Sequence, residues 1–270
     1  MMMAGSLTAM AAGPAAQPLV RSAPPAMTAV RAAVLYDAAT GRILAERHPS
    51  ARLPVGSLVK LMTARIALLD GRPAEPLVVP AAATEVPETR ADLVPGQRIR
   101  LGLLTAVLLI RSANDAAVTI ATGMAGTQQA FVARMNAAAE RLGLRDTRYA
   151  DASGLDAPGQ WSSAADVGRL AALDMRLPRF RQLVVERQVS LPGGHVFRNV
   201  NDYLRTDPAA AGIKSGYTTR ADFCVAAAER RNGRLLIAVV LGGPNWPTVD
   251  TLALHLLDWG YATAPASGSG

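Results

Sequence analysis

The 270 residues contain only one cysteine, three histidines and two lysines, and each scarcity excludes something. One thiol forms neither an internal disulfide nor a cysteine metal cluster, and Cys224 lies in an apolar run typical of a buried, inert thiol. The histidines share no close spacing, so we expect no metal ion and no other cofactor. The longest apolar run, residues 101–110, has about half the length that a bilayer crossing needs, so we expect no transmembrane segment.

Positive charge is plentiful, but nearly all of it comes from arginine. Of the 28 lysine and arginine residues, 26 are arginines, and the formal net charge is +7. The arginines are spread along the chain without a basic block, which is typical of a solvated surface, and we expect no nucleic-acid partner. Half of the residues are apolar, so the composition argues against a disordered chain and fits one large domain.

The two ends of the chain differ in composition from the rest. Residues 1–28 carry the small alanines of a signal cleavage region but no lysine or arginine ahead of the apolar part, so we interpret them as a weak or shortened signal segment. Residues 29–262 are expected to form the folded domain. The last residues, 263–270, are predicted to be a disordered tail.

Strand patterns occupy both ends of the domain, and helical patterns occupy its middle. We expect hairpins over residues 29–48, around Gly193–Gly194 and around Asn232–Gly233. Helices are expected from a Ser57 cap to Asp70, over 101–110, 114–124 and 128–142, from Ser162 or Ser163 to about 173, and over 249–259. This order predicts an α+β fold: an antiparallel sheet built from both chain ends, flanked by helices, with an inserted helical layer.

The first of the two lysines stands in the stretch PVGSLVKLMTA, residues 54–64. Ser57 and Lys60 are three residues apart at a predicted helix start, so the hydroxyl and the amine share one face. A serine is a weak nucleophile until a base takes its proton. A lysine with a depressed pKa can be that base, whereas an arginine cannot lose its proton. On this pattern alone, a capping serine beside a surface lysine is an equally good interpretation.

The second lysine, Lys214, lies in AGIKSGYTT, which reads as a strand. Gly216 shares a face with it, and a glycine there lets a ligand backbone approach; the alternative is an exposed edge-strand lysine beside a turn glycine. Between the two lysines, RSANDAA places Ser112 and Asn114 in a break between two predicted helices. The hydroxyl can relay a proton and the amide can pair with a peptide bond, although helix capping is the ordinary role of such residues.

Together, and in this order, these residues resemble the motif set of β-lactamases and penicillin-binding proteins. The stretches PVGSLVKLMTA, SANDAA, GLDAPGQWSSAADVGRLA and GIKSGYTTRADFC look like the D-alanyl-D-alanine carboxypeptidases, the low-molecular-mass penicillin-binding proteins. The resemblance covers roughly residues 29–262. It implies a β-lactamase/transpeptidase-like fold and a penicillin-binding D,D-peptidase catalytic domain over that range.

The resemblance implies a serine peptidase that removes the terminal D-alanine from peptidoglycan stem peptides through an acyl-enzyme, with β-lactam antibiotics as covalent inhibitors. Ser57 would attack, Lys60 would be the general base, and Ser112 would relay the proton to the leaving amine. The backbone N–H groups of Ser57 and Tyr217 would form the oxyanion hole, and Asn114 would hold the substrate amide. The substrate-binding residues implied are Asn114, Lys214, Ser215, Gly216, Tyr217 and Thr218.

The carboxylate-binding end departs from the family pattern. Lys214 and the Ser215 hydroxyl would meet the terminal carboxylate, with Ser215 in place of the commoner threonine. Asp222 stands where glycine is usual, and no arginine occurs near Val249, where the family tends to place one that assists the carboxylate. Arg220 is the candidate substitute.

Three other functions share part of this pattern. An endopeptidase that cuts peptidoglycan cross-links would share every motif. A serine β-lactamase would need a carboxylate base with an asparagine partner after Tyr149, where the chain offers Asp151 and Asp156 but neither Glu nor Asn. A catalytically silent wall-binding module would have no need of a deprotonatable lysine. For the peptidase we expect export to the periplasm despite the weak leader, and a monomer.

Overall fold

The computed structural model describes residues 23–87, 89–205 and 207–263. Residues 264–270 of the expected disordered tail and most of the expected leader segment therefore lie outside the described residues. The tail was expected from residue 263, but Thr263 is helical, as the last residue of the final helix. No helix in the described part of the chain is both long and apolar enough to cross a membrane.

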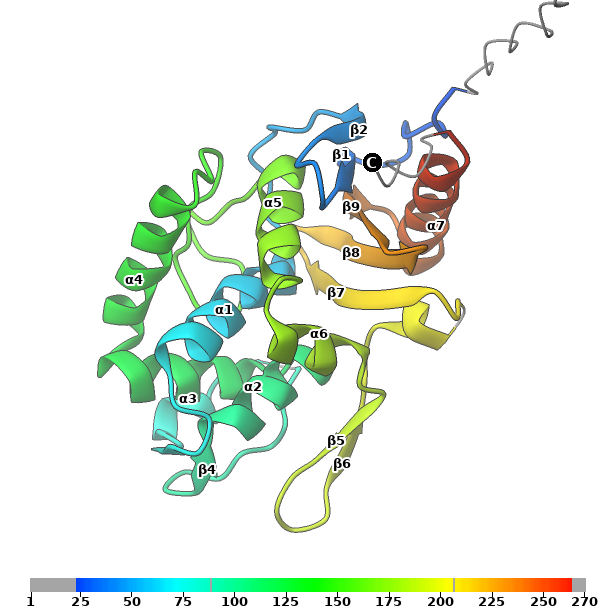
Figure 1. Cartoon of the computed structure of the whole chain (residues 1–270). Helices are drawn as coiled ribbons and strands as arrows, with labels where there is room; N and C mark the ends of the chain where they lie inside the picture. Colours follow the sequence, from blue (N-terminus) through cyan, green and yellow to red (C-terminus); the bar gives the residue numbers. More distant parts are fainter. Residues whose placement is uncertain (1–22, 88, 206, 264–270) are drawn as a thin grey trace, which may run out of the picture.

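The centre of the molecule is a five-stranded antiparallel sheet in the order β2-β1-β9-β8-β7 (Figure 1). Strands β1 (Ala32–Asp37) and β2 (Ile43–Arg47) come from the start of the chain, and β7 (Ala210–Thr218), β8 (Asp222–Arg231) and β9 (Arg234–Gly243) come from its end. The two groups join where β1 pairs with β9, with Val34 opposite Val239. The predicted α+β fold with a sheet from both chain ends is thus confirmed.

The two faces of the sheet are covered by different helices. Along β1, Ala33 and Leu35 pack into the cluster that includes Leu256 of helix α7 (Trp246–Thr263), while Ala32 and Val34 belong to the larger core on the opposite face. Helix α5 (Ala164–Asp174) covers that opposite face (Figure 1). The alternation follows from the strand geometry, because successive side chains point to opposite faces.

The helical layer is inserted between β2 and β7 in the chain. It contains α1 (Lys60–Asp70), α2 (Leu101–Ile110), α3 (Asn114–Ala125), α4 (Gln128–Arg141), α5 and α6 (Pro178–Val185). The short elements are the 3₁₀ turns η1 (Gly56–Val59), η2 (Ala81–Ala83) and η3 (Asp202–Arg205), and the strand pairs β3 (Pro76–Val78) with β4 (Arg98–Arg100) and β5 (Gln188–Ser190) with β6 (Val196–Arg198).

The hairpin predictions are confirmed, and other elements differ from the sequence-based prediction. No strand was predicted between residues 76 and 100, where β3 and β4 pair at the two ends of the segment. Helix α7 begins at Trp246, three residues before the expected Val249. Helix α6 was not expected at all: Pro178 occupies its first turn, and Phe180 and Leu183 are buried. Its eight residues are too few to show a helical period clearly in the sequence.

Candidate active site

Ser57 lies in the 3₁₀ turn η1, one turn ahead of α1, and not at a helix cap as expected. No side-chain cap bond is made at the start of η1 or of α1. Gly56, which precedes it, has a φ of 54°, a left-handed value that glycine adopts without strain. The serine hydroxyl is therefore free of the helix backbone, and its neighbour is the amine of Lys60, with Oγ 2.9 Å from Nζ.

Lys60 is fully buried, and its amine is surrounded by oxygen atoms. Besides the Ser57 hydroxyl, Nζ lies 2.7 Å from Asn114 Oδ1 and 2.5 Å from the carbonyl oxygen of Ser153. Burial lowers the pKa of Lys60 to about 7, although the charges of Asp151 and Asp115 act in the opposite direction. A large fraction of this lysine is thus neutral near pH 7.

The three contacts have different meanings in the two charge states of Lys60. A charged ammonium can donate to all three oxygens. A neutral amine has two N–H groups, which the acceptor-only Ser153 carbonyl and the Asn114 amide oxygen can take, and one lone pair, which is left for the Ser57 hydroxyl. The geometry therefore allows the neutral amine to accept the proton of Ser57, which is the task of a general base.

The carbonyl of Ser153 is held in place by a loop folded around the carboxylate of Asp151. Asp151 accepts hydrogen bonds from the backbone N–H and hydroxyl of Ser153, from the N–H of Gly154 and from the side-chain amide of Gln160, at 2.6–3.3 Å. Sequence reasoning considered Asp151 only as a candidate hydrolytic base. The structure gives it a different place, as the anchor of the loop that contacts Lys60.

The α2–α3 break brings Asn114 to Lys60 and leaves Ser112 beside it. The Asn114 amide donates 3.1 Å to the carbonyl of Pro87 while its oxygen faces Lys60, so the side chain is fixed at both ends. Asn114 is the first residue of α3 and is not its cap. Ser112 is buried with a φ of 65°, and within the described residues its hydroxyl makes no hydrogen bond.

Strand β7 carries the second lysine. Lys214 is buried, and its Nζ donates 2.8 Å to the carbonyl of Ser215. Burial, and then the charge of Lys60, lower the pKa of Lys214 well below its ordinary value. The exposed edge-strand alternative is therefore wrong. A carboxylate bound beside Lys214 would offset both effects and favour the charged ammonium.

Gly216 allows β7 to lie against the turn that carries Ser57. A side-chain carbon placed on Gly216 would lie 2.9 Å from the backbone nitrogen of Ser57, and one placed on Gly56 would lie 3.0 Å from that of Tyr217. The close approach expected at Gly216 is thus made by the chain's own backbone. It brings the backbone amides of Ser57 and Tyr217 to one side of the site.

The side chains after Gly216 point to other partners. The Tyr217 ring, half exposed, packs on Phe223 with ring centroids 4.7 Å apart, and Phe223 meets Trp246 at 4.9 Å. Thr218 donates its hydroxyl to Asp156 at 2.7 Å, and the backbone N–H of Arg220 donates to the same carboxylate at 3.1 Å. Asp156 thus ties the loop after Tyr149 to the end of β7.

Two positions that differ from the family pattern, Asp222 and Val249, have clear structural roles. Asp222, where the family usually has glycine, adopts a φ of 55° and forms a 3.1 Å ion pair with Arg31. Arg31 also donates to the carbonyls of Arg220 and Ala221 at 2.9 and 2.6 Å. Val249 is buried. Sequence reasoning missed Arg31, because only the fold brings the start of β1 to the β7–β8 turn.

No group of three or more histidine, cysteine or acidic residues in the described ranges could hold a metal ion. The arrangement described above instead combines a serine hydroxyl with a buried amine of lowered pKa and adjacent backbone amides. These are the parts of a serine acyl-transfer site, on a fold in which an antiparallel sheet carries an inserted helical layer.

Comparison with known proteins identifies the class and then the family. Solved structures with this fold include penicillin-binding protein 6B from Escherichia coli, with a TM-score of 0.84 and 32% identity over 90% of this chain and 80% of that one. A D-alanyl-D-alanine carboxypeptidase from Mycobacterium tuberculosis gives a TM-score of 0.86 and 31% identity over 95% and 99%. The fold is therefore that of the penicillin-binding serine peptidases.

The family model for D-alanyl-D-alanine carboxypeptidases matches residues 19–245. Carboxypeptidase DacB2 of M. tuberculosis is 33% identical over 88% of this chain and 84% of its own length. DacA of E. coli is 30% identical over 84% of this chain, which spans 60% of that relative. The chain belongs to the D-alanyl-D-alanine carboxypeptidase family, and it is a peptidase of the hydrolase class.

Proposed function

We propose that the chain removes the terminal D-alanine from peptidoglycan stem peptides through an acyl-enzyme on Ser57. The observation that carries this proposal is the buried amine of Lys60, which has a pKa of about 7 and lies 2.9 Å from the Ser57 hydroxyl. Family membership supports the same activity. We also propose residues 29–262 as the catalytic domain.

In the proposed reaction, neutral Lys60 takes the Ser57 proton while Oγ attacks the carbonyl carbon of the penultimate D-alanine. The developing oxyanion would accept hydrogen bonds from the backbone amides of Ser57 and Tyr217, each contributing roughly 3 to 4 kcal/mol at the transition state. Ser112 would pass the proton to the leaving amine, and Asn114 would hold the substrate amide. Water would then hydrolyse the acyl-enzyme and release Ser57.

The terminal carboxylate would bind at β7, beside Lys214 and the Ser215 hydroxyl. Burial lowers the pKa of Lys214. A carboxylate that binds beside it would raise this pKa again, so that Lys214 takes up a proton and forms an ion pair with the carboxylate. Gly216 and Thr218 would serve indirectly, the first by admitting the Ser57 turn and the second through Asp156.

One observation supports a peptidase over a β-lactamase. Asp151 and Asp156 are the carboxylates in the loop after Tyr149, and both accept hydrogen bonds that hold this loop in place. We propose that their role is to position the loop and not to activate a water molecule for rapid deacylation. We further propose that β-lactams acylate Ser57 and that the enzyme acts in the periplasm, where its substrate lies; the monomeric state stays a prediction.

The proposal is tested by incubating the protein with a labelled penicillin and mapping the adduct. We expect a long-lived covalent adduct on Ser57 and none in Ser57→Ala. We also expect D-alanine release from a pentapeptide that ends in D-Ala-D-Ala. Rapid turnover of the penicillin would favour a β-lactamase, and the absence of both adduct and D-alanine release would favour a silent binding module.

A further inference from the structure

A cleft of ≈ 270 Å³ lies between the β5–β6 hairpin and the turn η3. Its lining includes three arginines, Arg187, Arg198 and Arg205, together with Asn199 and Asn201. Nothing in the reaction proposed above uses it. In Figure 1 the β5–β6 hairpin projects away from the five-stranded sheet, beyond its edge strand β7.

The charges in this cleft are not balanced. Arg205 pairs with Asp202 at 2.5 Å. The guanidinium groups of Arg187 and Arg198 are exposed and form no ion pair with any described residue. Since guanidinium groups bind carboxylates through two parallel hydrogen bonds, an unpaired couple on adjoining strand ends favours an acidic ligand.

A second, independent feature points to a ligand. Asn201 is 3% exposed, and its amide nitrogen Nδ2 has no hydrogen-bond partner among the described residues. Leaving a buried donor unpaired destabilises the fold, so such groups are rare in folded proteins. Its neighbour Asn199 is fixed by donating 2.9 Å to the carbonyl of Glu186 and by accepting from the N–H of Asn201. The cleft is therefore lined by two unpaired cations and by Asn201, whose buried amide nitrogen would need only a partner on the cleft side to be satisfied.

The cleft adjoins the end of the active site that is proposed to bind the terminal carboxylate. Val200, between the two asparagines, accepts a 3.5 Å contact from the Ser215 hydroxyl and donates 3.0 Å to the carbonyl of Ile110 at the end of α2. Val200 thus links the lining of the cleft to Ser215, the residue proposed to meet the terminal carboxylate.

We propose that the cleft binds a carboxylate on the leaving-group side of the substrate, beyond the position of the terminal D-alanine. This inference rests on the proposed function and extends it to leaving groups larger than one residue, such as the acidic amino acid released when a peptide cross-link is cut. Arg187 and Arg198 hold the carboxylate, and the amide of Asn201 donates the further hydrogen bond.

The test uses two peptides in which D-alanine is joined to the side-chain amine of Nα-acetyl-lysine. One ends in a free carboxylate and the other in a carboxamide, so they share the scissile bond and differ only in the group that reaches the cleft. We expect the carboxylate peptide to have a KM about tenfold lower or more, the effect of charge-assisted hydrogen bonds. Equal KM values for the two peptides would overturn the proposal.

Three variants test whether the difference in KM between the two peptides arises in the cleft. The double variant Arg187→Gln, Arg198→Gln should abolish the difference between the peptides, and Asn201→Asp, which adds a carboxylate, should reverse it. Arg145→Gln removes an exposed charge elsewhere and should retain the wild-type difference. A preference that survives in the double variant would place carboxylate recognition elsewhere.

A failure of the proposed function gives a different result. In that case neither peptide is hydrolysed and penicillin does not label Ser57. Calorimetric binding of the two peptides to Ser57→Ala still tests the cleft, because it requires no turnover. Tighter binding of the carboxylate form supports the inference, and equal binding contradicts it.

Discussion

The charge state of Lys60 depends on two opposing effects. Burial lowers its pKa to about 7, and the carboxylate of Asp151, followed by that of Asp115, raises it. Because Lys60 can act as a base only when neutral, acylation of Ser57 should rise with pH up to about 7 and level off above that value. The measurement is the rate of adduct formation with a labelled penicillin across pH 5–9.

Asp151→Asn should move that profile to lower pH. The substitution removes a negative charge that favours protonated Lys60, so the pKa of Lys60 falls and the rising part of the profile shifts with it. An asparagine oxygen can still accept from the N–H groups of Ser153 and Gly154, so the loop keeps much of its anchor. A purely structural effect would lower the rate at every pH without moving the midpoint.

Asp70→Asn is the matched control, since this exposed carboxylate pairs with Arg134 at the far end of α1. Its profile should coincide with that of the wild type. A midpoint that stays in place in Asp151→Asn, or that moves to higher pH, would contradict the proposed influence of Asp151 on Lys60.

At residue level, the contact between Ser57 and Lys60 could be predicted, while their catalytic roles stay a prediction. The two residues are three apart at the start of a helical segment, a spacing that favours one shared face and left a capping serine with a surface lysine as the alternative. The Ser153 contact could not be predicted, because every residue has a backbone carbonyl and only the loop folded around Asp151 directs this one to Lys60. The ion pair between Arg31 and Asp222 joins positions 191 residues apart, so sequence spacing gives no signal for it.

At the scale of elements, the site depends on how closely β7 approaches the turn η1. Gly216→Ala would place a methyl group 2.9 Å from the Ser57 nitrogen and 3.0 Å from the Val55 carbonyl, both backbone atoms that cannot rotate away. Such overpacking costs typically about 1–3 kcal/mol of stability. A 1 Å displacement of the nucleophile can cost about a hundredfold in rate. We therefore expect acylation to fall by about that factor in a protein that still folds.

Gly168→Ala provides the control for that substitution. Gly168 lies in α5, where an added methyl group would be 3.5 Å from Tyr36 and Val34, an ordinary contact distance. Alanine favours a helix interior over glycine, so stability should be kept or increased, with normal acylation. Normal acylation in Gly216→Ala, measured with labelled penicillin beside thermal unfolding, would show that the close approach is not needed for the reaction.

Elements were predictable where turn residues marked their ends. Asn232 and Gly233 both adopt positive φ values, 49° and 79°, as a two-residue hairpin turn requires, and they fix the β8–β9 hairpin. By contrast, the 3₁₀ turn that holds Ser57 forms where the segment packs against Gly216. A serine before a helix looks like a cap in the sequence, and this tertiary contact decides otherwise.

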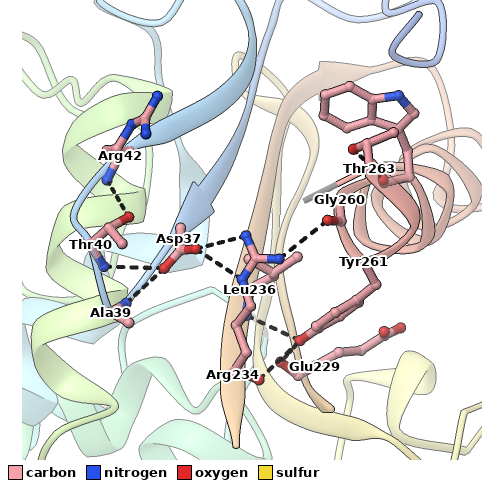
Figure 2. A network of polar contacts seen from close by, with 11 residues as sticks. Asp37, Ala39, Thr40, Arg42, Glu229, Arg234, Leu236, Gly260, Tyr261 and Thr263 are labelled. Carbon is pink, nitrogen blue, oxygen red and sulfur yellow. Dashed lines mark hydrogen bonds and ion pairs between the residues drawn. The ribbon is translucent and has the colours of Figure 1, made fainter. Parts of the chain in front are cut away.

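At the scale of the whole molecule, hydrogen bonds and an ion pair hold the elements from the two ends of the chain together. Figure 2 shows the network at the β1–β9 junction, where the carboxylate of Asp37 accepts from the backbone of Ala39 and Thr40 and from the guanidinium group of Arg234. Tyr261 of α7 joins the same network by donating to the carbonyl of Glu229 at 2.7 Å and accepting from the N–H of Leu236. The first strand, the last strand and the last helix are thereby held together.

The ion pair in this network should stabilise the fold in a pH-dependent way. Burial tends to raise the pKa of Asp37, but Arg234 and the Thr40 and Ala39 amides outweigh burial and hold it below the ordinary value of 3.8. A carboxylate with a lowered folded-state pKa contributes stability that is present above its ordinary pKa and lost as the pH falls through the folded-state pKa. The contribution should therefore be complete at pH 7 and should decrease once the pH falls below 3.8.

Asp37→Asn tests this directly. The variant keeps an oxygen for the Ala39 and Thr40 amides but removes the negative charge that pairs with Arg234, whose side chain is 9% exposed. We expect a loss of about 3 kcal/mol in the free energy of unfolding at pH 7, measured by urea denaturation, because one partner of a buried pair is removed.

Asp258→Asn is the control. It removes an exposed carboxylate on α7 that pairs with Arg231, and it should cost about 0.5 kcal/mol or less in the free energy of unfolding. The Asp37→Asn loss should shrink as the pH falls below 3.8 and then through the lowered pKa of folded Asp37, where the wild-type carboxylate also becomes neutral. A loss of the same size at pH 3 and pH 7 would mean that shape, and not the charge shared with Arg234, stabilises the junction of the chain ends.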